Sequence, residues 1–370
     1  MKMAGLVVVL AACGGSGSKP AGPAQGPSGK SVDPSAQLAI KSEDVTVTVG
    51  GRGVPSTIVA PTAAGPWPGV VMIAGSGPTD RNWNSPLLPA QNGSGKLLAE
   101  ALAAHGAVVI RFDKAGSTKD NPGPPIAEFT FDTYRDEAVA VLAALRARPD
   151  VRTDRVFVAG HSEGGLHATR LALVAPTEIA GVIYLSSASR SMADTMLTQI
   201  EGNLRNPLAM LSEQQITAEL TSLRAALADF FAGKPVDPTK ASALPPLQQL
   251  VAQMVSPQTA GLMRGLLGYD NAAEAPKVTV PVLIVNGAKD MQVDPELDAK
   301  PLHAAFIAAH RDATLHISPE ADHVLKHEPK TLAEIRADQK AAQDAYNAEG
   351  RVLDADVLQA VVAWLAAHTR

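Results

Sequence analysis

The chain has 370 residues and a formal net charge of −5, from 32 Lys and Arg against 37 Asp and Glu, and it contains one cysteine. The mildly negative charge and the lack of a basic run argue against nucleic acid as a partner. A single thiol cannot form an internal disulfide or build a thiolate metal site.

The N-terminus is predicted to be a processing signal, covering residues 1–13, that is not part of the fold. Lys2 precedes an apolar run through Leu10, far shorter than the ~20 residues needed to span a bilayer. The sequence from Leu10 to Cys13 resembles a bacterial lipobox, so Cys13 is the predicted lipidation site; an ordinary signal peptide is the alternative. We therefore expect an extracytoplasmic lipoprotein, anchored to a membrane on the periplasmic side or at the cell surface.

Composition divides the rest of the chain into a spacer and a folded domain. Residues 14–37 are rich in Gly, Ser, Pro and Ala, which is typical of a flexible linker. The folded domain is expected over 38–370. Within it the β pattern vanishes over 189–276, where helix-like segments such as 213–231 and 244–255 replace it. This stretch is predicted to be a helical insertion that caps the site.

The remainder of the domain predicts an α/β fold with a doubly wound, mostly parallel sheet. Two β patterns at 45–49 and 56–60 are expected to form an antiparallel edge, and after them strands alternate with helices. The later predicted strands are 70–74, 107–112, 156–159, 179–185, 281–286 and 313–317. The predicted helices are 95–105, 132–147, 166–174, 295–309 and 355–368.

A Gly-x-Ser-x-Gly motif, with Gly160, Ser162 and Gly164, stands between a predicted strand and a predicted helix. In this context the serine lies on a tight elbow with its hydroxyl exposed. The glycines are needed because a side chain there would collide with the neighbouring strand or helix. Ser162 is therefore the predicted nucleophile; the alternative is that it only caps the helix.

A serine hydroxyl is a poor nucleophile at neutral pH, so it needs a base and an acid that orients the base. In this class of site the chain order is serine, acid, histidine. Asp290 and His323 each follow a predicted strand, on the side where open α/β sheets place their ligands. They are the predicted acid and base. Asp294 is the alternative acid, although its position before Pro295 is typical of a helix cap.

Two other histidines lie near His323 in the sequence. His316 alternates within a predicted strand, which favours packing in the sheet, and His327 lies on a charged stretch that looks solvated. A metal site formed by the three is the alternative, but the chain has no His-Glu-x-x-His motif. We predict neither a metal nor another cofactor.

The site also needs two backbone N–H groups to hold a developing oxyanion, one after the nucleophile and one after the third strand. Glu163 is the predicted first donor. Ser76, in the turn Gly75-Ser76-Gly77, is the predicted second donor, with Gly77 in reserve. The same turn lacks the third glycine of a dinucleotide-binding loop, since Asp80 stands there.

These motifs resemble those of serine esterases of the α/β-hydrolase superfamily. The resemblance is to bacterial esterases with Gly-Ser-Gly-Pro-x-Asp-Arg near their start and Gly-His-Ser-x-Gly-Gly at the elbow, found here at residues 75–81 and 160–165. Residues 113–116 form Asp-Lys-Ala-Gly where such esterases usually have Asp-Lys-Arg-Gly. Ala74 stands where many of them have histidine.

The resemblance implies a serine carboxylesterase that hydrolyses short- to medium-chain acyl esters through an acyl-enzyme, without a cofactor. Its partners would be a small ester substrate and, through the lipid anchor, a membrane. Two alternatives remain open from the sequence. One is a serine aminopeptidase or amidase on the same fold, and the other is a non-catalytic surface lipoprotein that uses the fold for binding.

Overall fold

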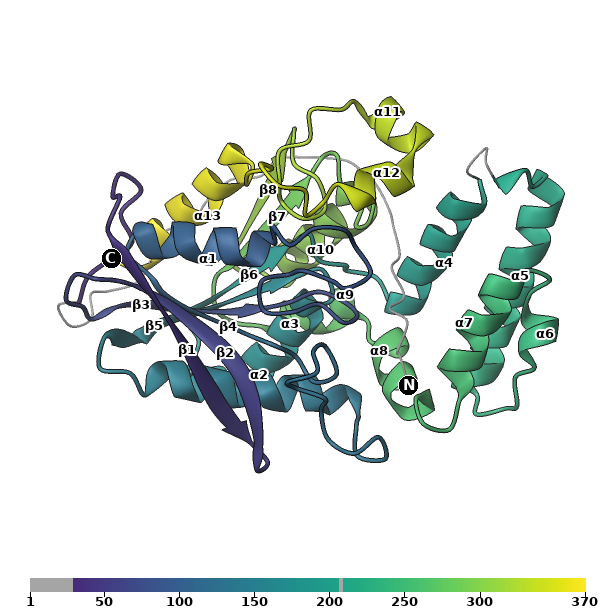
Figure 1. Ribbon diagram of the computed structural model, residues 1–370, viewed down its shortest axis with the longest axis horizontal. Coiled ribbons are helices and arrows are strands. Elements are labelled where there is room, and N and C mark those ends of the chain that lie inside the picture. Colours follow the sequence, from purple (N-terminus) through teal and green to yellow (C-terminus); the bar gives the residue numbers. More distant parts are fainter. Residues whose placement is uncertain (1–28, 206–208) are drawn as a thin grey trace.

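The computed structural model describes residues 29–205 and 209–370 (Figure 1). Residues 1–28, with the predicted signal and Cys13, lie outside the described residues. The described chain forms an eight-stranded sheet with helices on both faces, and a further group of helices stands beside it. Within the described ranges, no helix combines the length and apolar character needed to cross a bilayer.

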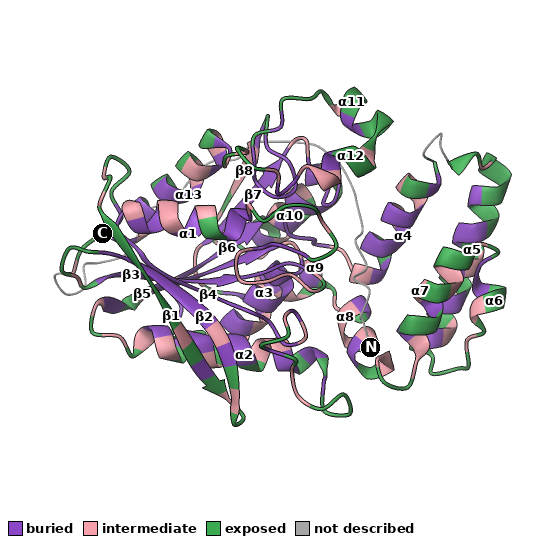
Figure 2. Ribbon diagram, in the orientation of Figure 1, coloured by how far each residue is buried: buried purple, intermediate pink, exposed green. Residues whose placement is uncertain are grey.

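The sheet confirms the predicted mostly parallel α/β architecture. Its strand order is β1-β2-β4-β3-β5-β6-β7-β8. β1 pairs with β2 and β2 with β4 in antiparallel register, and all later pairs are parallel. The strands are β1 (Ile40–Val49), β2 (Arg52–Pro61), β3 (Trp67–Ile73), β4 (Val108–Phe112), β5 (Val151–His161), β6 (Gly181–Leu185), β7 (Val282–Gly287) and β8 (Ala313–Ser318). Most central strands are buried along their whole length (Figure 2), which explains their continuous apolar sequences.

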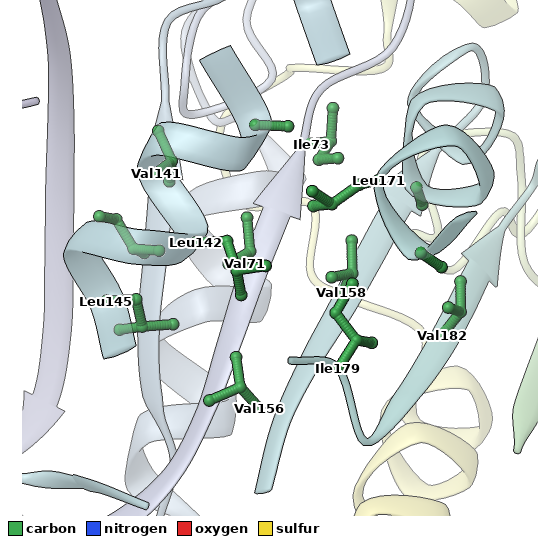
Figure 3. Packing of buried hydrophobic residues seen from close by; sticks show 14 of the residues in the cluster. Val71, Ile73, Val141, Leu142, Leu145, Val156, Val158, Leu171, Ile179 and Val182 are labelled. Atoms are coloured by element: carbon green, nitrogen blue, oxygen red, sulfur yellow. The ribbon is translucent and has the colours of Figure 1, made fainter. Parts of the chain in front are cut away.

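Helices form a separate hydrophobic core on each face of the sheet. One face packs against α1 (Ser94–Ala104) and α13 (Ala355–His368), and the other against α2 (Phe131–Arg146), α3 (Gly164–Val174) and α10 (Lys300–Ala308). Figure 3 shows the second core, where Val71 and Val158 of the sheet lie between Leu142 of α2 and Leu171 of α3. Such β-branched and leucine side chains drive the packing by removing apolar surface from water.

The helical pattern at 295–309 differs in detail from the expectation. It is divided into a π-helical turn, η3 (Pro295–Ala299), and α10. Asp294 caps this turn by accepting hydrogen bonds from the backbone N–H groups of Glu296 and Leu297, as predicted. Two short helices after the last strand, α11 (Leu332–Ala337) and α12 (Gln339–Asp344), were not predicted, because six residues are too few to show a helical period.

Between β6 and β7 the described residues form helices and no strand. They are α4 (Met192–Leu204), α5 (Glu213–Phe231), α6 (Pro238–Ala241), α7 (Pro245–Val255), α8 (Ala260–Gly268), α9 (Asn271–Glu274) and the 3₁₀ turn η2 (Ala275–Lys277). α4 to α7 lie to one side of the sheet (Figure 1), and they share a hydrophobic cluster that includes Leu223, Phe230 and Met254. We call α4 to α8 the cap.

The two ends of this insertion are joined to each other and to α3. The Asn271 side-chain amide donates to the Ala188 carbonyl at 3.1 Å, and the Ala272 N–H donates to the Ser189 carbonyl at 2.7 Å. The Asn271 amide oxygen accepts a hydrogen bond of 2.7 Å from Thr169 of α3. The cap therefore leaves and rejoins the sheet domain at one fixed point.

The expectation of a flexible spacer through Gln37 does not hold for residues 30–37. The Val32 side chain is buried, and its N–H donates to the Thr369 hydroxyl at 3.0 Å. The Lys30 carbonyl accepts a hydrogen bond of 2.8 Å from the Arg152 guanidinium. These residues belong to the folded domain, because their main-chain groups find hydrogen-bond partners in distant parts of the chain.

This packing predicts a stability difference between two truncated variants. A variant that lacks residues 1–37 should be less stable than one that lacks residues 1–28, by about 2 kcal/mol or more, because burial of one Val side chain contributes roughly that much. Urea denaturation followed by circular dichroism measures the difference. Equal stabilities would show that residues 29–37 do not contribute to the fold.

Candidate active site

Ser162 stands in the turn between β5 and α3, with a backbone φ of 53°. A Cβ atom at Gly160 would lie 2.2 Å from the Gly164 carbonyl oxygen, and one at Gly164 would lie 2.4 Å from the Ile73 carbonyl oxygen. Both positions therefore require glycine. The structure confirms the strained elbow that the motif predicts, and such strain is characteristic of functional sites.

Asp290 and His323 are in direct contact. The His323 Nδ1 atom lies 2.9 Å from Asp290 Oδ2 and 3.1 Å from Oδ1. The carboxylate is completely buried, and Oδ1 also accepts from the N–H groups of Gln292 at 2.6 Å and Val293 at 2.8 Å. The Asn286 side-chain amide donates to Oδ2 at 3.2 Å. This shell fixes the carboxylate, and with it the orientation of the imidazole.

One cavity of about 580 Å³ is lined by both Ser162 and His323. Ser76 and Glu163, the predicted oxyanion donors, line the same cavity. The structure thus brings the predicted serine, the predicted histidine and its aspartate to one edge of the sheet, beyond the carboxyl ends of β5, β7 and β8. This is where parallel α/β sheets form their sites.

The alternative histidines lie elsewhere. His316 Nε2 is 2.8 Å from an Asp356 carboxylate oxygen, and His327 is half exposed with Nδ1 3.4 Å from Asp354. Neither lines the cavity. Among the residues that the structure describes, no cluster of three or more His, Cys, Asp or Glu side chains could hold a metal ion.

His161, the residue before the elbow serine, contacts the backbone of His323. Its Nε2 atom lies 2.8 Å from the His323 carbonyl oxygen, and its ring stacks on Trp83 with centroids 4.7 Å apart. Burial, with the nearby His323, lowers the pKa of His161 from 6.5 to about 3. The neutral ring can therefore donate its Nε2 proton to that carbonyl and hold the histidine loop in place.

The predicted oxyanion loop packs directly on the elbow. A Cβ atom at Gly75 would lie 3.1 Å from Ser162 Cβ, so the glycine permits this close approach. Glu163 is the N-cap residue of α3, and N–H groups at the start of a helix have no intrahelical acceptor. Ser76 and Glu163 both line the cavity with Ser162, so their N–H groups remain the candidate donors beside the serine.

The Asp-Arg pair of the first motif anchors this loop. Asp80 accepts hydrogen bonds from the N–H groups of Asn82 at 2.7 Å and Asn84 at 2.9 Å. The Arg81 N–H and side-chain Nε donate to Asp113 Oδ1 at 2.8 and 3.3 Å. Asp113 follows β4, so the motif ties the loop after β3 to the loop after β4.

Sequence reasoning missed a buried charged network behind the oxyanion loop. Lys114 Nζ lies 3.0 Å from Glu163 Oε1 and 2.7 Å from the Gly75 carbonyl oxygen, and Glu163 Oε1 lies 3.1 Å from His167 Nε2. Burial alone would raise the pKa of the Glu163 carboxyl, but Lys114 and His167 lower it well below its ordinary value. The sequence features that could have indicated this network are the Asp-Lys sequence after β4 and the glutamate of the elbow motif.

The cap supplies a mostly apolar wall to the cavity. Met196, Met254, Leu262 and Met263 of the cap line it, whereas Phe230 and Leu197 pack inside the cap. The cavity-lining residues in the described part of the chain include a single carboxylate, that of Glu163, which is already paired. The cavity therefore suits a neutral, largely apolar molecule.

Comparison with known proteins is consistent with this geometry. Residues 70–335 match the sequence profile of the alpha/beta hydrolase family. The chain is 26% identical over 262 residues to esterase EstD of Thermotoga maritima, an alignment that covers 71% of this chain and 54% of that protein. The chain thus spans about half the length of the curated relative that it matches.

Two solved structures were also matched, and the first of them shows similarity of fold alone. A hypothetical protein from Pseudomonas aeruginosa has a TM-score of 0.50 at 15% identity, covering 91% of this chain and 97% of that one. A thermophilic esterase from Thermogutta terrifontis, with malate bound, has a TM-score of 0.49 at 16% identity, covering 89% and 100%.

The buried network predicts a loss of stability in acid. Burial, opposed by Glu163, lowers the pKa of His167 from 6.5 to about 4, so the unfolded chain binds more protons than the folded one between these values. The free energy of unfolding should therefore fall as the pH falls from 6.5 to 4, through this group by about 3 kcal/mol at most. His167→Gln keeps a donor for Glu163 but does not titrate, so its stability should depend less on pH. Denaturant unfolding at several pH values measures both slopes, and identical slopes would contradict this assignment.

Proposed function

Because the chain belongs to the alpha/beta hydrolase family, we propose that it is a serine carboxylesterase that hydrolyses short- to medium-chain acyl esters. One observation carries the proposal. The imidazole that Asp290 orients opens on the same cavity as the serine of the elbow, beside two candidate backbone donors. The similarity to an esterase is consistent with it.

In the proposed reaction, His323 removes the proton of Ser162 as the serine oxygen attacks the ester carbonyl. Asp290 holds the imidazole in orientation and stabilises its charged form. The N–H groups of Ser76 and Glu163 stabilise the oxyanion of the tetrahedral intermediate. The imidazolium then protonates the leaving alcohol, and a water molecule activated by the same histidine hydrolyses the acyl-enzyme. No cofactor takes part.

The character of the cavity favours esters over aminoacyl amides. An aminopeptidase must bind the ammonium group of its substrate, and a buried ammonium needs a partner of opposite charge. The one carboxylate among the described lining residues, that of Glu163, is bound to Lys114 and His167. The methionines and leucines of the cap instead suit a flexible acyl chain, because methionine side chains adapt to varied apolar shapes.

We also propose that Cys13 carries a lipid that anchors the protein on the outer side of the cytoplasmic membrane or at the cell surface. The support is the sequence alone, in which small residues precede the single cysteine after a short apolar run. Several acyl chains would anchor the protein stably, since each buried CH₂ contributes about 0.8 kcal/mol.

The esterase proposal predicts hydrolysis of nitrophenyl esters with short and medium acyl chains, and no hydrolysis of aminoacyl nitroanilides. Ser162→Ala should lower kcat/KM by about 10⁴-fold or more, and Asp290→Asn by about 10⁴-fold, because the serine and the oriented base act as a unit. Asp294→Asn is the matched control, since asparagine also caps helices and should keep kcat/KM within about tenfold.

Three results would contradict this proposal in whole or in part. Activity on aminoacyl amides alone would identify a peptidase or amidase. If folded protein were not labelled by a fluorophosphonate, or if labelling persisted in Ser162→Ala, the non-catalytic binding alternative would stand. Loss of activity in Asp294→Asn but not in Asp290→Asn would exchange the roles of the two aspartates.

The anchor proposal predicts that the full chain, made in a bacterial host fed an alkyne fatty acid, becomes labelled and sediments with membranes. Cys13→Ser should lose the label and leave the membrane fraction. Ser162→Ala is the control and should keep both properties. A Cys13→Ser variant that still carries the fatty acid would exclude this cysteine as the acceptor.

A further inference from the structure

Lys114 is a buried lysine whose ammonium group contacts other groups of the protein. Its side chain is 2% exposed, and its Nζ atom donates to the Gly75 carbonyl oxygen at 2.7 Å and lies 3.0 Å from Glu163 Oε1. The ring of Tyr134 lies 4.9 Å from the same nitrogen. The ammonium thus joins three separate segments: the loop after β3, the elbow, and α2.

The hydrogen bond from Lys114 to the Gly75 carbonyl also fixes the orientation of the Ser76 N–H. The Gly75 carbonyl and the Ser76 N–H belong to one planar trans peptide, so they point in opposite directions. When Lys114 holds the oxygen, the Ser76 N–H is held pointing away from Lys114. Ser76 lines the cavity that contains Ser162, and it is the proposed second oxyanion donor.

The bond to Glu163 acts on the other proposed donor. The Glu163 carboxylate belongs to the same residue whose backbone N–H is the first oxyanion donor, and its side chain is buried beneath the elbow. An uncompensated carboxylate at this position would repel the negative charge that develops on the oxyanion. Lys114 neutralises it and fixes the position of the residue.

Stability alone does not account for the pair. Replacing a buried ion pair by apolar side chains of similar size is often neutral or stabilising, because desolvation offsets the attraction between the charges. What an apolar side chain could not do is donate a hydrogen bond to Gly75.

We propose that Lys114 is a positioning residue for the oxyanion hole, whose ammonium orients the peptide of Ser76 and neutralises Glu163 beside it. The proposal rests on the esterase function proposed above. It assigns the lysine of the Asp-Lys-Ala-Gly turn to transition-state stabilisation, although this lysine does not contact the substrate.

The test is the double variant Lys114→Met/Glu163→Gln, which removes both charges and so leaves no unpaired buried ion. Its kcat on a nitrophenyl ester should fall about 10- to 100-fold, less than loss of a whole oxyanion donor causes, while KM stays within about threefold. Affinity for a trifluoromethyl ketone, which forms an oxyanion with the serine, should fall by the same factor as kcat. The single variant Lys114→Met should lose more activity than the double variant, because it leaves the carboxylate uncompensated.

Arg152→Met is the control, because it removes a buried guanidinium that pairs with the partly exposed carboxylate of Asp154 at the opposite end of β5. It should lower thermal stability and leave kcat unchanged. Lys114→Arg keeps the charge and a donor, so it should recover part of the activity, and whatever it loses should appear in kcat and inhibitor affinity and not in KM. This variant decides the question if the double variant does not fold.

A folded double variant with kcat within about threefold of the wild type, or a Lys114→Arg defect confined to KM, would overturn the proposal. Fluorophosphonate labelling of the wild type distinguishes failure of the proposed esterase function from failure of the proposed role of Lys114. An unlabelled, inactive wild type would overturn the proposed function and this role with it. A labelled wild type with an unaffected double variant would overturn the role of Lys114 alone.

Discussion

The sharp turn at Ser162 is the constraint on which the rest of the site depends. Its backbone lies at a positive φ of 53°, a conformation that costs of order 1–3 kcal/mol and persists only when the surroundings enforce it. A hydrogen bond of 2.9 Å from the Ser162 N–H to the Leu185 carbonyl and the contact of two bare glycines enforce it here. The turn also separates neighbouring side chains, so that His161 reaches the histidine loop while Glu163 reaches Lys114.

The loop that carries His323 depends on a second set of buried charges. Asp322 accepts a hydrogen bond of 2.9 Å from the Lys326 N–H and pairs with Arg351 at 2.9 Å. The Lys326 ammonium donates to the Tyr346 carbonyl at 2.8 Å, and Tyr346 lines the cavity beside His323. Burial raises the pKa of Asp322 to about 6 and lowers that of Lys326 to about 8. The segment between β8 and α13 therefore holds the loop of His323 in place.

Local pattern was enough to predict the parallel sheet and the convergence of Ser162, Asp290 and His323, because each follows a strand and the strand ends share one edge. It was not enough for contacts between distant segments. Lys114 and Glu163 are 49 residues apart, and neither periodicity nor composition pairs them. Residues 30–37 have the composition of a linker, yet Val32 bonds to Thr369, 337 residues away. The composition of a segment indicates how much apolar surface it can bury by itself. It does not indicate the hydrogen bonds and contacts that a distant part of the chain can provide.

The chemistry and the shape of the site come from different parts of the chain. Every proposed catalytic group belongs to a loop at the end of a strand, where buried hydrogen bonds fix it. The apolar wall comes from the cap, whose ends are joined by the Asn271–Ala188 and Ala272–Ser189 hydrogen bonds and whose helices share their own core. A change inside the cap can therefore reshape the cavity without disturbing the elbow. Under the proposed function, rigid donors would lower the barrier and adaptable methionines would accommodate the acyl chain, so the substrate range could change while the mechanism stays the same.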